Sequence, residues 1–176
     1  IDDTILKTMG RRTSEKEIKN LIEKIRNAGD VAIRSTFIVG FPGETDEQYQ
    51  KLYDFIGEYK LNYAGFFAYS KEDGTAAAKL KNQIPQAVKN KRLKNITALQ
   101  SKVIFENNKN YVGKTLKVLY EGIDYDNNIF YGRPEFCAPE VDAKVLFSSD
   151  NLVNVGNFYD VKITGANGYD LVGEVK

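Results

Sequence analysis

The 176-residue sequence contains no histidine and no tryptophan, and its only cysteine is Cys137. Without histidine, the chain by itself has no route to Ser-His or Cys-His catalysis and no imidazole ligand for a metal. One cysteine allows neither an internal disulfide nor a cluster of thiolates around a metal. A self-sufficient active site would therefore have to use carboxylates, lysine, tyrosine or a bound cofactor.

Long apolar segments are also missing. No run of about 18 apolar residues and no apolar leader occurs, so we expect a soluble, cytoplasmic protein that makes no membrane contact. The first residue is Ile1 rather than Met, from which we expect a piece excised or processed from a longer protein. The formal net charge of +1 gives no overall indication of a charged partner.

The first part of the chain alternates between helix and strand patterns. Ser14 and Glu17 have the spacing of a capping box, and the helix that they start is predicted to end at Gly29. A nearly continuous apolar strand follows at residues 31–39, as expected when helices cover both faces of a parallel sheet. A further helix and a second apolar strand at residues 63–69 complete the pattern of βαβ units.

The pattern changes in the second part of the chain. A long polar helix is predicted at about residues 85–110, and from Lys114 the apolar residues alternate with a period of two. Five short strands separated by Gly and Asn turns predict a small five-stranded antiparallel barrel of the OB kind. We expect one domain at residues 1–112 and a second at residues 113–176.

The charges divide unequally between the two predicted domains. Residues 1–113 hold 19 basic against 14 acidic residues, a net charge of +5, whereas residues 114–176 hold 6 against 10, a net charge of −4. Small barrels that bind nucleic acid carry a basic surface, which this one lacks. The count favours a basic protein partner for the barrel, although charges that only keep the surface soluble explain it equally well.

A tight turn joins the first strand to the next helix at residues 35–45. Gly40 and Gly43 remove Cβ atoms where the backbone turns sharply or approaches a ligand, and Thr45 fits a helix N-cap. Glu44 is expected to stabilise the start of that helix electrostatically rather than to touch a ligand. Ligands of open α/β sheets bind beyond the carboxyl ends of the strands, where this turn lies. An ordinary connection and a ligand site are both open on these residues alone.

The turn nevertheless resembles a known motif. Residues 36–45, Thr-Phe-Ile-Val-Gly-Phe-Pro-Gly-Glu-Thr, are similar to the second signature of radical S-adenosylmethionine (SAM) enzymes of the methylthiotransferase branch. Residues 9–13 agree with that branch, and the small barrel resembles its TRAM domain. The resemblance implies an α/β fold: the C-terminal part of a partial (β/α) radical SAM barrel, followed by TRAM.

Two groups of this family modify different substrates, a tRNA base or an aspartate of a small-subunit ribosomal protein. The loop at residues 69–75 carries acids where the tRNA group has an Arg-Pro pair, and residues 132–142 resemble a run of the ribosomal-protein group. Pro134 and Cys137 depart from that run, in which Ser and Asp stand at these places. The resemblance therefore implies the ribosomal-protein group, with a tRNA methylthiotransferase whose TRAM domain binds RNA as the alternative.

The resemblance also implies cofactors that this chain does not hold by itself. The complete enzymes use SAM and two [4Fe–4S] clusters, and they ligate the reactive cluster through a Cys-x-x-x-Cys-x-x-Cys motif that is absent here. In them, a 5′-deoxyadenosyl radical removes a hydrogen from the aspartate β-carbon, and a methylthio group is delivered. We therefore expect the chain alone to be inactive and to contain no catalytic residue and no metal ligand.

The resemblance assigns the cofactor contacts to the first strand and its turn. Ile38, Gly40, Phe41 and Gly43 are predicted to touch SAM through the backbone and through apolar contacts. Arg34 is the single charge in an otherwise apolar strand, and a buried guanidinium needs a partner. That partner is either the SAM carboxylate or a neighbouring acid of the protein.

Substrate contacts are predicted in two places. Tyr69 and Glu72 follow the second strand and are expected to face the substrate, with simple solvation of the loop as the other explanation. In the barrel, Arg133, Glu140 and Asp142 are the candidates for binding a basic small-subunit ribosomal protein. The acidic barrel makes RNA the less favoured partner, and no membrane partner is expected.

Overall fold

The computed structural model describes residues 1–175 and divides into two compact units, Ile1–Gln100 and a second from Ser101 onward. Each unit has its own apolar core. No helix among the described residues is long and apolar enough to cross a membrane.

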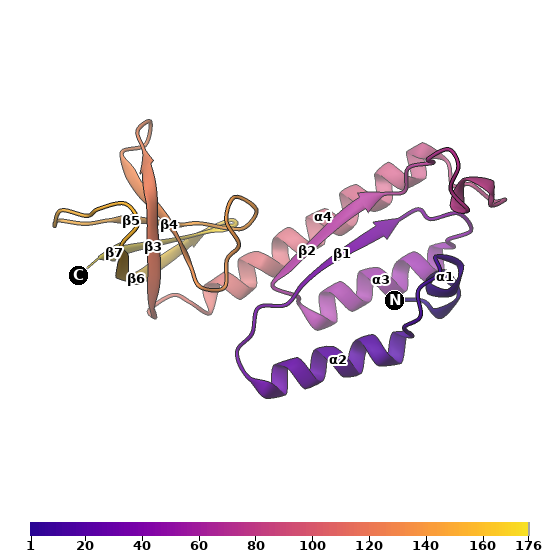
Figure 1. The fold of residues 1–176 in the computed structure, drawn as a ribbon, viewed down its shortest axis with the longest axis horizontal. Coiled ribbons are helices and arrows are strands. Elements are labelled where there is room, and N and C mark those ends of the chain that lie inside the picture. Colours follow the sequence, from indigo (N-terminus) through magenta and orange to yellow (C-terminus); the bar gives the residue numbers. More distant parts are fainter. Residues whose placement is uncertain (176) are drawn as a thin grey trace. The chain divides into compact units, whose positions relative to one another are not determined.

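The first unit is built from helices around a two-stranded parallel sheet. β1 and β2 run side by side in the same direction, with Arg34 opposite Tyr63 and Val39 opposite Ala68 (Figure 1). This arrangement confirms the predicted βαβ order. The elements in chain order are α1 (Asp3–Thr8), α2 (Glu15–Ala28), β1 (Arg34–Val39), α3 (Asp46–Tyr59), β2 (Tyr63–Ala68), the 3₁₀ turn η1 (Ala77–Lys79) and α4 (Gln86–Lys109), which continues into the second unit.

Capping boxes start α2 and α3 as the sequence predicted. The Ser14 hydroxyl accepts from the Glu17 N–H at 3.3 Å, and the Glu17 carboxylate accepts from the Ser14 N–H at 2.8 Å. Thr45 and Gln48 form the same reciprocal pair at the start of α3. Each box satisfies N–H groups that the first helical turn leaves without a partner.

Within residues 1–175, helices pack against one face of the sheet and leave the other uncovered. Val39 is fully buried with Leu52 and Ile56 of α3 and Ile96 of α4, and Phe37 packs against this core. On the other face, Arg34, Thr36 and Ile38 are exposed, since successive strand residues alternate between faces. The expectation of a strand covered on both faces is therefore wrong for the described residues.

The second unit contains a closed five-stranded barrel with strand order β3-β4-β5-β7-β6. The strands are β3 (Thr115–Asp124), β4 (Ile129–Pro134), β5 (Val145–Ser148), β6 (Phe158–Asn167) and β7 (Asp170–Val175). Four of the neighbouring pairs are antiparallel, but β5 and β7 are parallel because β6 separates them in the chain and reverses its direction. Alternate strand residues fill the interior, among them Val118, Tyr120, Val145, Phe147, Val161 and Ile163.

Candidate functional site

The carboxyl ends of β1 and β2 lie next to each other and lead into the turn that the sequence singled out. Gly40 has φ +70° and Gly43 has φ +85°, values that residues with a Cβ rarely adopt. The Glu44 N–H donates to the Phe41 carbonyl at 2.9 Å, and the Gly43 N–H donates to the Asn82 carbonyl at 2.9 Å. The turn is therefore fixed both by its own backbone and by the segment that follows β2.

Glu44 has a different role from the one predicted. It is 6% exposed, and its Oε2 accepts from the Gly40 N–H at 2.6 Å and pairs with Arg92 Nη1 at 2.6 Å. Thr45 is the N-cap of α3, whereas the Glu44 carboxylate fixes the preceding turn through the Gly40 N–H. Burial raises the pKa of Glu44, although the Gly40 N–H and Arg92 both favour its ionised form.

Two basic residues of α4 reach this turn, and the sequence reading missed both. Arg92 Nη2 pairs with Asp46 at 2.6 Å, and Lys89 Nζ donates to the Tyr69 carbonyl at 2.9 Å. Residues three apart lie on the same side of a helix, and this spacing is the only local sequence pattern that groups Lys89 with Arg92. Their contacts lie 20 to 48 residues away in the sequence, so no local pattern could reveal the partners.

Phe41 and Tyr69 are brought together, but beneath the surface. Phe41 is 4% exposed and Tyr69 is 8% exposed, and their rings meet edge to face with centroids 5.4 Å apart. The Tyr69 hydroxyl is buried without a hydrogen-bond partner among the described residues. The contacts of Phe41 with SAM and of Tyr69 with a substrate stay predictions.

The uncovered sheet face offers apolar side chains next to the turn. The parallel register sets Ile38 beside Phe67, which are 37% and 63% exposed, and sets Thr36 beside Gly65. A Cβ on Gly65 would meet only the Thr36 hydroxyl oxygen, at 3.7 Å, so the surface there is open. We call Thr36, Ile38, Gly65 and Phe67 the platform. The sequence reading missed Gly65 and Phe67, which the period-two alternation of β2 could have placed.

Arg34 lies at the opposite end of β1 from the turn. It is exposed, so the expectation of a buried guanidinium is wrong, and its guanidinium lies 5.2 Å from the Tyr63 ring centre. It shares a face with Ile38 but stands four residues earlier, about 13 Å along an extended strand. A role for Arg34 in binding SAM stays a prediction.

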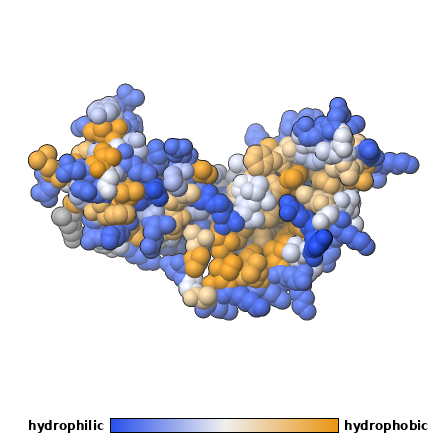
Figure 2. Space-filling view, viewed as in Figure 1, coloured by the Kyte–Doolittle hydropathy of each residue, from blue (hydrophilic) through white to orange (hydrophobic). Residues whose placement is uncertain are grey.

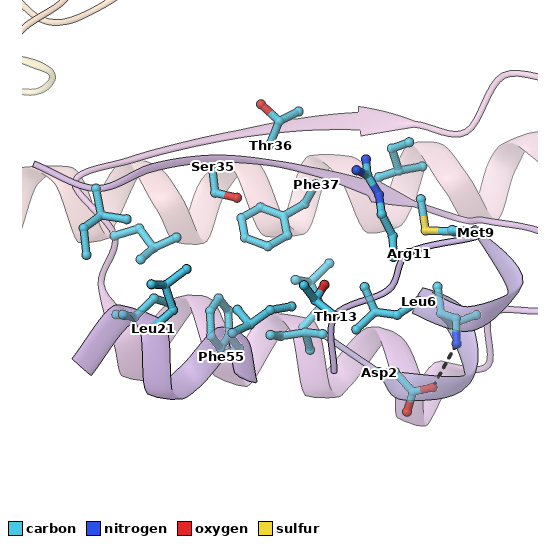
Figure 3. A pocket seen from close by; sticks show the side chains of 18 of the residues that line it. Asp2, Leu6, Met9, Arg11, Thr13, Leu21, Ser35, Thr36, Phe37 and Phe55 are labelled. Carbon is cyan, nitrogen blue, oxygen red and sulfur yellow. Dashed lines mark hydrogen bonds between the residues drawn. The ribbon is translucent and has the colours of Figure 1, made fainter. Parts of the chain in front are cut away.

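An apolar groove of about 550 Å³ follows β1 on the side away from β2. Ser35 and Phe37 point from β1 into it toward α2, whereas Thr36 points away (Figure 3). Hydrophobic side chains gather over the same region between α2 and β1 (Figure 2). Six consecutive residues, 33–38, line the groove. The groove therefore runs along the edge of β1 that has no partner strand among residues 1–175.

The candidate substrate residues have different surroundings. Arg133 pairs with Glu121 at 2.7 Å, and the Asp142 carboxylate accepts from the Ala138 N–H at 2.7 Å, so both hold the barrel together locally. Glu140 is exposed with φ +61°, and Glu72 is exposed in the loop after β2. Of these four, the two glutamates are the ones whose side chains lie open to solvent.

The described residues do not fit an iron–sulfur cluster. Residues 1–175 contain no group of three cysteine, histidine, aspartate or glutamate side chains that could hold a metal ion, and Cys137 is buried. They do fit part of SAM, because the platform presents an open apolar surface of the kind that the flat adenine ring contacts. Residues 1–175 therefore offer a surface for that cofactor but no set of ligands for a cluster.

Comparison with known proteins finds matches in two separate parts of the chain. The Radical SAM superfamily model matches residues 1–56, and the TRAM domain model matches residues 112–175. A protein of Alkaliphilus oremlandii (strain OhILAs) named ribosomal protein uS12 methylthiotransferase RimO is 45% identical over 177 residues, which cover 99% of this chain. The chain therefore contains a segment similar to the Radical SAM superfamily and a segment similar to the TRAM domain, and it resembles a protein named methylthiotransferase along nearly its whole length.

Other proteins of the same name agree. One from Acetivibrio thermocellus is 40% identical over 98% of the chain, and one from Thermoanaerobacter sp. (strain X514) is 41% identical over 98%. The chain spans only 38–40% of the length of these three relatives. The similarity therefore reaches across both units of the chain but covers the smaller part of each relative.

Proposed function

We propose that the chain is part of a radical SAM methylthiotransferase that modifies the β-carbon of an aspartate in the small-subunit ribosomal protein uS12. In this proposal, the first unit supplies one wall of the SAM site and the barrel recognises the ribosomal protein. The observation that carries the first half is the exposed apolar platform, which ends at the Gly40–Gly43 turn. The second half is supported by the relatives' printed name and by the barrel's net charge of −4.

The platform binds the adenosyl part of SAM through Ile38 and Phe67. Both side chains are exposed on the same face, where apolar contact with a ring removes their surface from water. The N–H groups of Gly40 and Gly43 already donate to Glu44 and Asn82, so the glycines serve the shape of the turn and not hydrogen bonding to a ligand. SAM supplies the methyl group and the reactive adenosyl group when it is bound.

The cluster ligands come from outside this chain, and the chain alone is inactive. The relatives are more than twice as long as the matched segment, which leaves room for the cysteines of the two [4Fe–4S] clusters. In the barrel, the exposed Glu140 is the residue best placed to attract a basic protein, because Asp142 and Arg133 are engaged within the fold.

The test uses the complete protein that contains this chain, reconstituted with iron and sulfide in the absence of oxygen. We expect mass spectrometry to find one added methylthio group on an aspartate of uS12 and none on tRNA. Modification of tRNA instead would overturn the substrate and favour the RNA-binding alternative. No modification of either substrate by a protein that holds its clusters would overturn the proposed activity.

The platform is tested by truncating Phe67. Loss of its apolar contact is expected to weaken SAM binding about tenfold for Phe67→Ala, measured as the dissociation constant in the complete protein. Phe105→Ala is the matched control, because Phe105 is also partly exposed but lies on α4 in the second unit. Equal SAM affinities of the two variants would count against the platform.

A further inference from the structure

The start of α4 is fastened to the carboxyl ends of both strands by two buried basic side chains. Lys89 is 7% exposed and Arg92 is 6% exposed, and each contacts a different strand end. Placing two cations in such a site is unfavourable unless each has partners of good geometry. The groups that pair with Lys89 and Arg92 therefore show which segments these two side chains fix in place.

Arg92 holds the turn that follows β1. One end of its guanidinium, Nη1, contacts Glu44 Oε2 at 2.6 Å and the Glu44 carbonyl at 3.2 Å, and the other end, Nη2, contacts Asp46 at 2.6 Å. The same Glu44 oxygen accepts from the Gly40 N–H at 2.6 Å. The planar fork thus connects α4 to Gly40 through one carboxylate and to the first turn of α3 through another.

Lys89 holds the end of β2 and fills the space beside Gly40. Its Nζ donates to the Tyr69 carbonyl at 2.9 Å and lies 5.3 Å from the Tyr69 ring centre. A Cβ on Gly40 would lie 2.3 Å from the Lys89 Cγ, so the lysine stem occupies the place that a side chain would need. Gly40 therefore contacts both the lysine stem and the Glu44 carboxylate.

We propose that Arg92 and Lys89 are positioning residues, through which α4 sets the conformation of the Gly40–Gly43 turn and thereby the affinity for SAM. The inference rests on the proposed function of the turn as part of the SAM wall. Neither side chain is open to solvent, so both act on the cofactor through Glu44, Gly40 and Tyr69. The proposal extends the SAM wall from the strand ends to a helix that begins more than 40 residues later in the sequence.

The experiment compares Arg92→Met, Arg92→Lys and the control Lys91→Met. Lys91 is the exposed neighbour of Arg92 on the same helix, so its substitution removes one cation without touching the turn. Hydrogen exchange of the Gly40 amide is followed in the 176-residue chain, and KM for SAM and kcat are measured in the complete protein. Arg92→Lys keeps the charge but not the fork that reaches Glu44 and Asp46 together.

For Arg92→Met, we expect Gly40 exchange and KM for SAM each to rise about tenfold, with kcat at saturating SAM within about twofold. Arg92→Lys should recover part of both losses, and Lys91→Met should change neither. A folded Arg92→Met variant with the Gly40 exchange or the SAM affinity of the unsubstituted protein would overturn the proposal.

Two further measurements cover the cases in which Arg92→Met does not fold or the complete protein does not bind SAM. Asp46→Asn alters a side chain that is 91% exposed, so it should fold even where Arg92→Met does not, and we expect about threefold effects in the same direction. If Arg92→Met does not fold, unchanged Gly40 exchange and unchanged KM for SAM in Asp46→Asn would overturn the proposal. Absence of SAM binding by the unsubstituted complete protein would contradict the proposed function, whereas Gly40 exchange would still report on the role of Arg92.

Discussion

Gly40 is the residue at which backbone conformation and packing impose the same requirement. Its φ of +70° disfavours any side chain, and the Lys89 stem fills the space where a Cβ would stand. We expect Gly40→Ala to lower the free energy of unfolding by about 2–3 kcal/mol, since strain and overpacking act together. Urea unfolding of the 176-residue chain measures the change.

Gly57 provides the matched control because it lies inside α3 with open space around its Cα. Gly57→Ala should raise the free energy of unfolding by about 0.5–1 kcal/mol, because alanine restricts the unfolded chain more than glycine and favours the helix. The two substitutions are chemically identical, so their opposite signs separate the effect of position from that of the residue. Equal effects would contradict the argument for Gly40.

Single residues also show which parts of the site a sequence can reveal. The Ser14 and Thr45 caps and the glycines of the turn were predictable, because their partners and dihedral angles are set within a few residues. The pairing of Glu44 with Arg92 was not, since 48 residues separate them. The wrong expectation for Arg34 has the same origin: burial depends on what covers a strand face, and no local pattern reports that.

Among the elements, the β3–β4 hairpin offers a turn whose electrostatics can be measured. Asp124 accepts from the side chain of Asn127 at 2.8 Å and from the backbone N–H groups of Asn127 and Asp126 at 3.2 and 3.0 Å. The Asn127 side chain and these N–H groups hold the pKa of Asp124 below its ordinary value of 3.8. A carboxyl with a lowered pKa stabilises the fold above pH 3.8, and this contribution disappears as the pH falls through the folded-state pKa.

We expect Asn127→Ala to raise the pKa of Asp124 toward 3.8, because the substitution removes its side-chain donor. A titration of the Asp124 carboxyl carbon by NMR measures the shift. Asn95→Ala, in the exposed part of α4, should leave the titration unchanged. An Asp124 pKa that does not move in Asn127→Ala would contradict the role of the Asn127 side chain and would leave the backbone N–H groups and the charge of Lys144 as the cause of the low pKa.

The change of apolar period predicted the switch from helices to the barrel, but it did not predict how the strands pair. A period of two specifies which side of each strand faces the interior, and the buried Val118, Val161 and Ile163 follow it. The parallel pairing of β5 with β7 depends on where the chain passes β6, which alternation does not encode. The sequence therefore predicts which face of each strand is buried better than it predicts the order in which the strands pair.

At the scale of the whole molecule, the least predictable feature is where the second unit begins. The apolar pattern places a boundary between residues 112 and 113, which stays a prediction, whereas the compact unit starts at Ser101 within α4. The Asn108 side chain donates to the carbonyls of Gly168 and Tyr169 at 3.3 and 2.8 Å, and the Tyr111 ring stacks on Phe136 with centroids 5.0 Å apart. These contacts join the end of α4 to the barrel.

The boundary can be tested by comparing two pieces of the chain, residues 101–176 and residues 113–176. We expect both to fold, with the shorter piece less stable by about 2–3 kcal/mol, because it loses the Asn108 hydrogen bonds and the Tyr111 stack. Guanidinium unfolding measures both free energies, and Asn108→Ala in the longer piece should account for about 1–2 kcal/mol of the difference. Pieces of equal stability would place the boundary after Tyr111, as the sequence pattern does, and would make the end of α4 a connection outside the folding unit.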